Sequence, residues 1–424
     1  MKPNMTRLEL ETLQIHGHTT VGWDINTPPN EYVDEYGHVV PKSVHYGERD
    51  PYTPRRRAYD DPEVVNLREY LRENNGLRDL EICSPSEVKR AARIFHRDGF
   101  VVVEDLLSTT LLAEMREVCA NYLRQILAFE GLNGQRYMQE SGRLPHRYCY
   151  GTTSASRQMM HDPVWVKMID LPTSTPILTE IFGTSEYRVW GGGGDLSLPG
   201  AIEYQHLHTD GIDDQTNFAD RVRAASRKGI SVSEDADFQE LDFRTQRRIM
   251  DFANPGVTIN FLMCDLTFEN GPIRQIPGSH TMSTPPPIPE EEPEWMRLST
   301  LVSARAGAGV IRDTRAWHGA TPNLSKEIRA MPSIEYSAGW GSGKHFLKTM
   351  PYDLWETLSP HARDICRDIR QEPGVWPFGA GFMHPLAGVL RDKYVEDSNG
   401  SDTSKTVRTD ARSAGKAVRV FNGQ

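Results

Sequence analysis

Two histidines and one aspartate are spaced so that they could bind a single metal ion. His208 and Asp210 are separated by one residue, and a further histidine, His318, lies far downstream. Side chains in a strand alternate between its two faces, so His208 and Asp210 should project from the same face, with the third ligand coming from another strand. Two imidazoles and one carboxylate leave part of the ion open, which is the ligand set of non-haem Fe(II) oxygenases. The spacing therefore predicts a metal centre for oxidative chemistry.

Two other interpretations stay open from the residues alone. The same three ligands with an open position also suit a catalytic zinc ion, and hence a hydrolase. A different class is a catalytically silent jelly-roll protein that binds or senses a metal or a small molecule. His206 shares the alternation of His208 and Asp210, but a fourth protein ligand would close a position that the reaction needs. We therefore expect His206 to lie beside the ligands, to face the substrate, or simply to be a polar residue whose hydrogen bonds are satisfied.

The composition excludes several classes of partner. The chain has 424 residues, with 38% hydrophobic and 25% charged residues, enough for a sizeable core. A formal net charge of -10 repels phosphate groups, which argues against nucleic acid and against an anionic membrane. There is no secretory signal pattern and no apolar run of membrane-spanning length. The cysteines are widely spread, as expected for reduced thiols in a cytoplasmic protein; they are Cys83, Cys119, Cys149, Cys264 and Cys366.

The pattern along the chain predicts a domain with flanking segments. Residues 1–84 are polar and poorly periodic, and we interpret them as an extended arm over the core. Residues 85–345 contain short apolar runs punctuated by Gly, Pro and Asn, with a charged insert at about 215–250. This spacing is typical of a β-sandwich or jelly roll. We predict a mainly β domain with flanking helices and a double-stranded β-helix (jelly roll, cupin-like) core, followed by a C-terminal extension over residues 346–424.

Local signals place several elements within this frame. The capping-box pattern at residues 84–87 predicts the start of a helix, which should end at Asp98-Gly99. The remaining signals predict a strand at 100–103, a second helix from about Thr109, strands at 187–190 and 256–263, and a helical segment from Ser359 onward.

Three motifs follow the metal-binding pattern in a characteristic order. Residues 269–280 contain Asn-Gly-Pro and then Pro-Gly-Ser-His, residues 309–319 end in Trp-His-Gly, and an arginine follows at position 329. Together with the helix-to-strand entry at 95–103, this order resembles the phytanoyl-CoA dioxygenase family of Fe(II)/2-oxoglutarate enzymes. The resemblance covers roughly residues 85–345. The combined signature is specific, although each piece alone is not.

The resemblance implies an activity and a set of iron ligands. His208, Asp210 and His318 would ligate Fe(II), and 2-oxoglutarate would chelate the same ion. With O2, such enzymes hydroxylate a substrate and release succinate and CO2; desaturation, epoxidation and ring rearrangement use the same iron. Related halogenases have a small residue in place of the carboxylate, and this chain keeps the acid at Asp210.

The resemblance also implies contacts to the cosubstrate. Arg329, 11 residues after His318, fits the family arginine for the distal carboxylate of 2-oxoglutarate, and a guanidinium suits that task because it binds carboxylates bidentately. Gln205 and Thr258 fit positions that contact the cosubstrate in some relatives. Gln205 precedes His208 by three residues, so its role requires a local irregularity such as a β-bulge. His280, in the Pro-Gly-Ser-His segment, is not a metal ligand in the family.

The sequence says less about the substrate. We expect a small organic molecule of secondary metabolism, with an acyl-CoA as the alternative. The segments beyond the family core would shape a roomy pocket or an oligomer interface, so a homodimer is left open. Nucleic acid and membrane are not expected as partners.

Overall fold

The computed structural model describes most of the predicted domain. The described residues are 22–23, 57–76, 80–128, 146–150, 159–210, 218–227, 229–252, 256–282, 284–288, 290–339, 348–377 and 408–409. The chain forms two compact units. The first contains residues 1–150, 195–211 and 260–332, and the second contains residues 151–194, 212–259 and 333–424.

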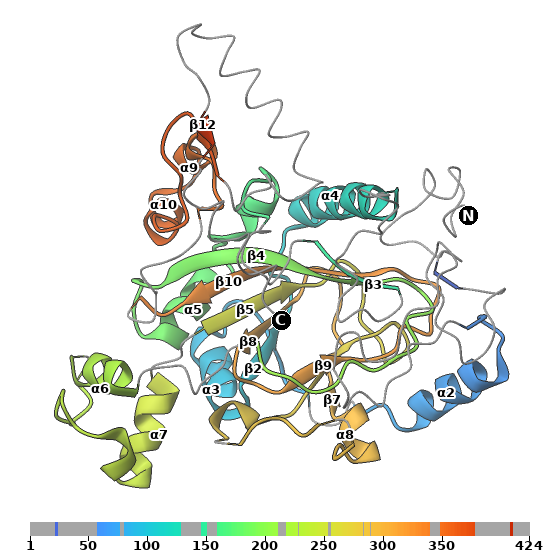
Figure 1. The fold of residues 1–424 in the computed structure, drawn as a ribbon, viewed down its shortest axis with the longest axis horizontal. Coiled ribbons are helices and arrows are strands. Elements are labelled where there is room, and N and C mark those ends of the chain that lie inside the picture. Colours follow the sequence, from blue (N-terminus) through green and yellow to red (C-terminus); the bar gives the residue numbers. More distant parts are fainter. Residues whose placement is uncertain are drawn as a thin grey trace, which may run out of the picture. The chain divides into compact units, whose positions relative to one another are not determined.

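The described strands include a seven-stranded and a three-stranded β-sheet (Figure 1). In spatial order, the seven strands of the larger sheet are β1 (Ile82–Cys83), β2 (Phe100–Val103), β8 (Gly309–Asp313), β5 (Gly256–Phe261), β10 (Arg329–Ser337), β4 (Arg188–Ser197) and β3 (Arg147–Cys149). The smaller sheet has the order β7 (Thr300–Leu301), β6 (Ile273–Gln275) and β9 (His318–Ala320).

The chain alternates between these sheets as a jelly roll does. After β4 in the larger sheet, it bridges to the β9 side of the smaller sheet, through Ala201 opposite Asn323 and His208 opposite His318. It then returns to the larger sheet as β5, enters the smaller sheet as β6 and β7, and continues as β8, β9 and β10 in alternation. This winding, with its antiparallel pairs, confirms the predicted jelly-roll core.

The helix-to-strand entry was predicted closely. Helix α3 (Val88–Asp98) buries Phe95 and ends at Gly99, whose φ of 83° lies in the left-handed region that glycine adopts readily. Strand β2 follows at once and pairs antiparallel with β8, with Phe100 opposite Arg312. The start of the helix differs from the prediction. The side chain of Glu87 accepts the Ser84 N–H at 2.8 Å, as in a capping box, but residues 85–86 form a turn, so the helix begins only at residue 88.

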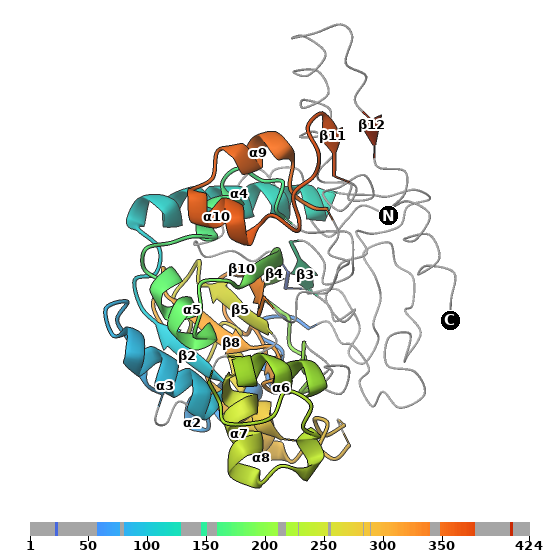
Figure 2. The ribbon, with the colours of Figure 1, turned by 90° about the vertical axis from the view of Figure 1, so that its left-hand side faces the viewer.

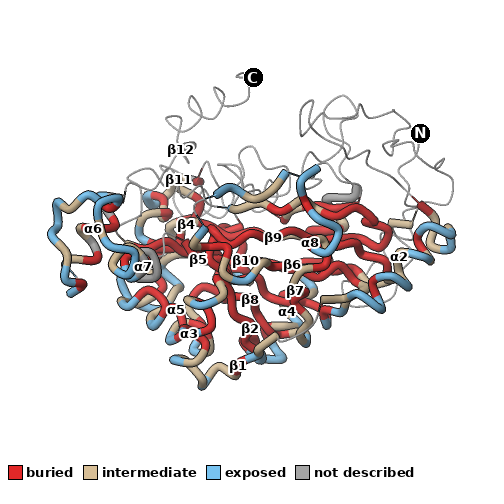
Figure 3. Tube along the Cα trace, turned by 90° about the horizontal axis from the view of Figure 1, so that it is seen from below, coloured by how far each residue is buried: buried red, intermediate tan, exposed pale blue. Residues whose placement is uncertain are grey.

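An apolar cluster within the first unit joins residues of the two sheets. The strands are buried along most of their length (Figure 3). Residues of β2 and β8 meet Ile273 of β6 in this cluster. Its buried members are Phe100, Val102, Leu262, Cys264, Leu266, Ile273, Val302, Ala308, Val310 and Met331. Helix α4 (Thr109–Ala128) begins where the second helix was predicted, and the short helix α8 (Glu294–Leu298) and the 3-10 helix η7 (Ser279–Thr281) also belong to this unit.

A helix lies inside the segment that was predicted to be an extended arm. Helix α2 (Pro62–Glu73) is capped by Asp61, whose side chain accepts the N–H of Glu63 at 2.9 Å. Val64 and Leu71 are seven residues apart, so they share one helical face, and both are buried. The arm is therefore not extended at this point. Residues 1–21, 24–56 and 77–79 of the predicted arm lie outside the described residues.

The second unit contains mainly helices (Figure 2). Helices α6 (Phe218–Arg227) and α7 (Phe243–Phe252) lie side by side within the predicted insert at 215–250 and share a buried cluster of Val222, Ala225, Ile230, Phe238 and Ile249. The unit also contains α5 (Thr175–Phe182), α9 (Tyr352–Glu356), α10 (Pro360–Ile365), η4 (Trp165–Met168), η6 (Phe238–Glu240), β11 (Val375–Trp376), β12 (Arg408–Thr409) and parts of β4, β5 and β10. Among the described helices of the chain, none has the length and apolar character needed to cross a membrane.

Candidate metal centre

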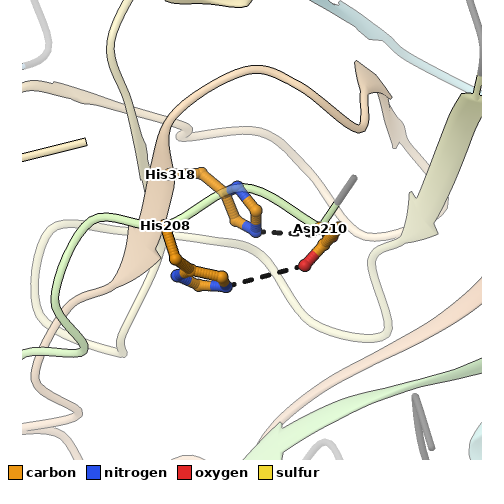
Figure 4. A group of neighbouring side chains, drawn as sticks. All are labelled: His208, Asp210 and His318. Carbon is orange, nitrogen blue, oxygen red and sulfur yellow. Dashed lines mark ion pairs between the residues drawn. The ribbon is translucent and has the colours of Figure 1, made fainter. Parts of the chain in front are cut away.

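The three predicted ligands converge on one point (Figure 4). Nε2 of His208 lies 3.6 Å from Oδ1 of Asp210, and Nε2 of His318 lies 3.5 Å from Oδ2 of the same carboxylate. One ligand atom from each residue lies within 4.8 Å of the other two. No second group of this kind was found in the part of the chain that the structure describes. The donor set is the one that the sequence predicted, two imidazole nitrogens and one carboxylate.

Backbone pairing brings the two histidines together. His208 donates its N–H to the carbonyl of His318, and His318 donates its N–H to the carbonyl of His208, each at 3.0 Å. Residues that exchange both bonds across an antiparallel pair project their side chains to the same side. Asp210 is held by a further bond from its N–H to the carbonyl of Thr314 at 2.9 Å. The third predicted ligand therefore lies on a neighbouring strand, as the sequence argument required.

A β-bulge precedes His208. The N–H of Gln205 bonds to the carbonyl of Ala320 at 2.9 Å, while His208 pairs with His318. Three steps along one segment thus face two steps along the other, which is the count that defines a bulge. The irregularity that the role of Gln205 required is present. Its side-chain oxygen, however, accepts the N–H of Ala320 at 3.2 Å, so that atom is already engaged.

The bulge relies on two neighbours from the smaller sheet. Arg274 donates from Nη2 to the carbonyl of Gln205 at 2.8 Å, and it also forms a buried ion pair with Glu292. Gly319 provides the space, because a Cβ at this position would lie 2.5 Å from the carbonyl oxygen of Gln205 and 3.0 Å from that of His206. A glycine after His318 is therefore needed for the close approach of the two segments.

Backbone carbonyls select the tautomer of both histidines. Nδ1 of His208 lies 3.1 Å from the carbonyl oxygen of His206, and Nδ1 of His318 lies 3.0 Å from that of Ala316. A carbonyl oxygen only accepts, so each Nδ1 carries the proton and each Nε2 keeps a lone pair for a metal. His206 thus contributes its backbone carbonyl to the orientation of the predicted ligand His208.

The charges around the centre favour metal binding. Burial would raise the pKa of Asp210, but the guanidinium of Arg312 and the neighbouring histidines outweigh it, so the pKa lies well below its usual range. Burial, and then the charge of Arg312, lower the pKa of His318 well below its usual range. The aspartate is therefore ionised and His318 is neutral at neutral pH, which are the forms that bind metals.

Arg329 has the properties of a site for an anion. It is fully buried at the start of β10, and none of its three guanidinium nitrogens has a hydrogen-bond partner. Burial lowers its pKa, while the negative charge of Asp195 acts in the opposite direction. Buried donors without a hydrogen-bond partner cost folding free energy, so this position fits the carboxylate of a bound ligand, which would supply the missing acceptors. The residues present therefore fit 2-oxoglutarate.

Thr258 lies on a strand, as predicted, and this strand is in the interior of the larger sheet. It is buried on β5, two residues before Asn260, so the two side chains share one face of that strand. The sequence analysis did not consider Asn260, whose buried Oδ1 has no hydrogen-bond partner. The signal that could have found it is a polar residue in alternation with Thr258 in an otherwise apolar strand.

Arg312 was also missed, although it contacts the predicted ligands. Its Nη2 donates to Oδ2 of Asp210 at 2.7 Å. The available signal was an arginine in alternation with Val310 within an apolar strand. His280 does not belong to the centre: it lies against Gly99, where a Cβ would approach its Nδ1 to 2.6 Å.

Fold and site together define the class of jelly-roll, metal-dependent oxygenases. The chain belongs to the phytanoyl-CoA dioxygenase (PhyH) family of Fe(II)/2-oxoglutarate-dependent dioxygenases, whose family profile matches residues 95–331, more than half of the chain.

A curated relative shares part of this region. The protein named dioxygenase af480, from Aspergillus fumigatus, is 32% identical over 117 residues, which are 25% of this chain and 35% of that protein. The chain thus matches about a third of the length of this relative.

Solved structures of similar fold come from enzymes with varied reactions. The epimerase SnoN, in complex with Fe3+, alpha ketoglutarate and nogalamycin RO, is 17% identical, with a TM-score of 0.39 over 60% of this chain and 84% of that one. The carbocyclase SnoK from nogalamycin biosynthesis is 17% identical, with a TM-score of 0.36 over 61% and 87%. HygX from Streptomyces hygroscopicus, with nickel, 2-oxoglutarate and hygromycin B bound, is 15% identical, with a TM-score of 0.37 over 59% and 86%. At this identity and TM-score, the likenesses carry no argument about the substrate of this chain.

Proposed function

We propose that this protein is an Fe(II)- and 2-oxoglutarate-dependent oxygenase that hydroxylates a small organic molecule. His208, Asp210 and His318 hold the iron, and Arg329 holds the distal carboxylate of the cosubstrate. When bound, the ferrous ion and 2-oxoglutarate supply the activation of O2. In the overall reaction, one oxygen atom enters a C–H bond of the substrate, the other enters succinate, and CO2 is released.

The unpaired guanidinium of Arg329 carries this proposal. A histidine and carboxylate group alone also suits zinc hydrolysis. A buried arginine with three unpartnered nitrogens calls for an anionic ligand, which a hydrolase of this kind does not need. The hydrolase interpretation therefore leaves Arg329 without a purpose.

The other residues of the chain have positioning roles in this proposal. The carbonyls of His206 and Ala316 hold the Nδ1 protons, so the imidazoles face the ion through Nε2. Gln205 and Thr258 are proposed cosubstrate contacts. Because Oε1 of Gln205 accepts the N–H of Ala320, Gln205 would contribute its amide N–H groups.

The decisive experiment measures succinate formation and cosubstrate binding together. Purified protein with Fe(II), O2 and 2-oxoglutarate should form succinate, at least slowly without substrate, and the signal should disappear when either component is omitted. Anaerobic titration with 2-oxoglutarate should show binding in the wild type and a loss of it in Arg329→Met. Binding of metal without any consumption of 2-oxoglutarate would instead support the catalytically silent jelly-roll protein.

For the substrate, we propose a small molecule of secondary metabolism over an acyl-CoA. Coenzyme A carries several phosphate charges, and a chain with a net charge of -10 produces a field that opposes them. Stimulation of 2-oxoglutarate turnover by a panel of CoA thioesters, and not by neutral polyketide or terpenoid scaffolds, would reverse this choice. We place the reaction in the cytoplasm, which is supported by the five cysteines, none of which forms a disulfide.

A further inference from the structure

Arg312 is a buried arginine whose guanidinium contacts the metal centre. Its side chain is 4% exposed, and its Nη2 donates to Oδ2 of Asp210 at 2.7 Å. Its Nη1 lies 3.2 Å from Nδ1 of His318, and its Nε has no partner. Among the described residues, Asp210 is the carboxylate that neutralises this guanidinium. A buried cation needs such a partner, so the two residues are tied to each other as well as to the site.

The backbone fixes the position of Arg312. It lies on β8 directly opposite Phe100 of β2, and the next residue, Asp313, donates its N–H to the carbonyl of Gly99 at 2.8 Å. Val310, two residues earlier, projects to the same face of β8 and is buried in the core between the sheets. The guanidinium therefore extends from a strand that is paired with β2 at this point and that has β5 as its other neighbour in the sheet. A support on a regular strand of this kind holds a side chain precisely.

The histidines alone do not determine which carboxylate oxygen faces a metal. Oδ1 of Asp210 lies 3.6 Å from Nε2 of His208, and Oδ2 lies 3.5 Å from Nε2 of His318. These two distances are nearly equal, so the triad is close to symmetric in this respect. Arg312 breaks the symmetry because it bonds Oδ2 and leaves Oδ1 without a guanidinium partner.

When a metal is bound, His318 does not compete with Asp210 for a hydrogen bond from Arg312. A guanidinium only donates, so a hydrogen bond from Arg312 to Nδ1 of His318 requires the proton on Nε2. Ligation through Nε2 requires the proton on Nδ1, which then points to the carbonyl of Ala316 at 3.0 Å. Asp210 is therefore the partner that Arg312 retains in the metal-bound protein.

We propose that Arg312 is a positioning residue that occupies Oδ2 of Asp210 and so keeps the carboxylate a ligand through Oδ1 alone. The inference rests on the proposed function. A carboxylate that is free to bind a metal through both oxygens takes an additional coordination position. 2-Oxoglutarate binds through two atoms, so it needs that position vacant. Arg312 thus preserves room for the cosubstrate at some cost in metal affinity, since its positive charge lies next to a ligand.

The test compares Arg312→Met with the wild type, using Co(II) as the metal probe and 2-oxoglutarate as the second ligand. We expect the variant to bind Co(II) at least as tightly as the wild type, because a cation beside the site is removed. We expect its Kd for 2-oxoglutarate, measured with Co(II) in place, to rise about tenfold or more, which is the low end of the losses in metal affinity or activity that follow removal of a residue bonded to a metal ligand. The visible absorption of bound Co(II) should also change, because the carboxylate adds a second oxygen.

Arg315→Met is the matched control, because Arg315 is a second buried arginine that is paired with a different carboxylate, Asp313. It should leave both Kd values and the Co(II) spectrum unchanged, even where it lowers the melting temperature. If Arg312→Met does not fold, Arg312→Lys is the second variant, because it keeps the positive charge and loses the forked geometry of the guanidinium. Its Kd for 2-oxoglutarate should rise, while its Kd for Co(II) should stay within about twofold of the wild-type value.

Two results would overturn the proposal. One is an unchanged Kd for 2-oxoglutarate in a folded Arg312 variant. The other is a Kd for Co(II) that rises tenfold or more, which would mean that Arg312 mainly supports metal binding. A wild type that binds neither Co(II) nor 2-oxoglutarate would contradict the proposed function instead, so the two failures are distinguishable.

Discussion

His208 and His318 exchange both of their backbone hydrogen bonds, each 3.0 Å long, across an isolated antiparallel bridge. The pairing places their rings 4.2 Å apart between centroids, on the same side of the two segments. Two ligands that are distant in the sequence are therefore aligned by main-chain atoms, which few substitutions alter. The geometry of the site consequently depends on how closely these two segments approach each other.

Gly319→Ala should disrupt this approach. The added Cβ would lie 2.5 Å from the carbonyl oxygen of Gln205, a backbone atom that cannot move without shifting the bulge before His208. We expect a loss of stability of about 1–3 kcal/mol, as for overpacking, and a larger loss of metal affinity. Isothermal titration with Mn(II) and urea denaturation would measure the two effects. Gly278→Ala is a control for stability, because a Cβ there meets nothing within 4 Å, although its φ of 79° adds some strain.

Asp210→Ala should abolish 2-oxoglutarate-dependent succinate formation. The substitution removes the carboxylate ligand and also leaves Arg312 as a buried cation without its partner. We expect turnover to fall by about 100-fold or more, since even residues that only orient ligands can contribute up to that factor. Asp210→Asn keeps the shape and removes the charge, so it separates the loss of a ligand from a loss of packing. Full turnover in the Ala variant would remove the proposed ligand set.

The sequence predicted the elements whose signals are local. Helix α3, strand β2 and the spacing of His208 and Asp210 depend on alternation and on punctuation by glycine, which a single segment carries. The two-histidine group could be assigned because the order of motifs resembled a known family. Helix α2 was missed, since its two buried residues, Val64 and Leu71, give a weak apolar pattern within a polar segment.

The contacts of Arg312 and Arg274 could not be predicted in the same way. Each arginine reaches a residue far away in the sequence, Asp210 in one case and Gln205 in the other. Such pairs depend on the register between strands, and no local pattern encodes that register. The bulge at Gln205 was anticipated only as a condition for its role. Its observed cause is that two residues, 206 and 207, face the single residue Gly319, and this became visible only with the pairing.

Arg329→Met should change stability and cosubstrate affinity in opposite directions. Without a ligand, the guanidinium is buried and unpaired, so replacing it with an apolar side chain should stabilise the apo protein by on the order of 1 kcal/mol or more. The same change removes the proposed carboxylate anchor, so 2-oxoglutarate should no longer raise the melting temperature.

Arg329→Lys provides the matched comparison for that experiment. It keeps a positive charge but cannot bind a carboxylate bidentately, so binding of 2-oxoglutarate should weaken without being lost. Thermal melting with and without saturating 2-oxoglutarate and Mn(II) measures both properties. If Arg329→Met is destabilised and still responds to 2-oxoglutarate as the wild type does, Arg329 is a structural residue and not the anchor.

The buried pair of Asp313 and Arg315 should make stability depend on acid pH. Arg315 binds both oxygens of the carboxylate, from Nε at 2.8 Å and from Nη2 at 2.6 Å. Burial would raise the pKa of Asp313, but the charge of Arg315 outweighs it and the pKa is lowered. A carboxyl group whose pKa is lower in the folded state stabilises the protein above its unfolded pKa of about 3.9, and this stabilisation is lost as the pH falls through the folded value.

Urea midpoints should therefore fall more steeply below about pH 4 in the wild type than in the double variant Asp313→Asn, Arg315→Met. Asp313→Asn alone should lose roughly 3 kcal/mol or more at pH 7, because Arg315 is left buried without its carboxylate. Equal acid slopes in the wild type and the double variant would show that this pair does not set the acid limit of the fold.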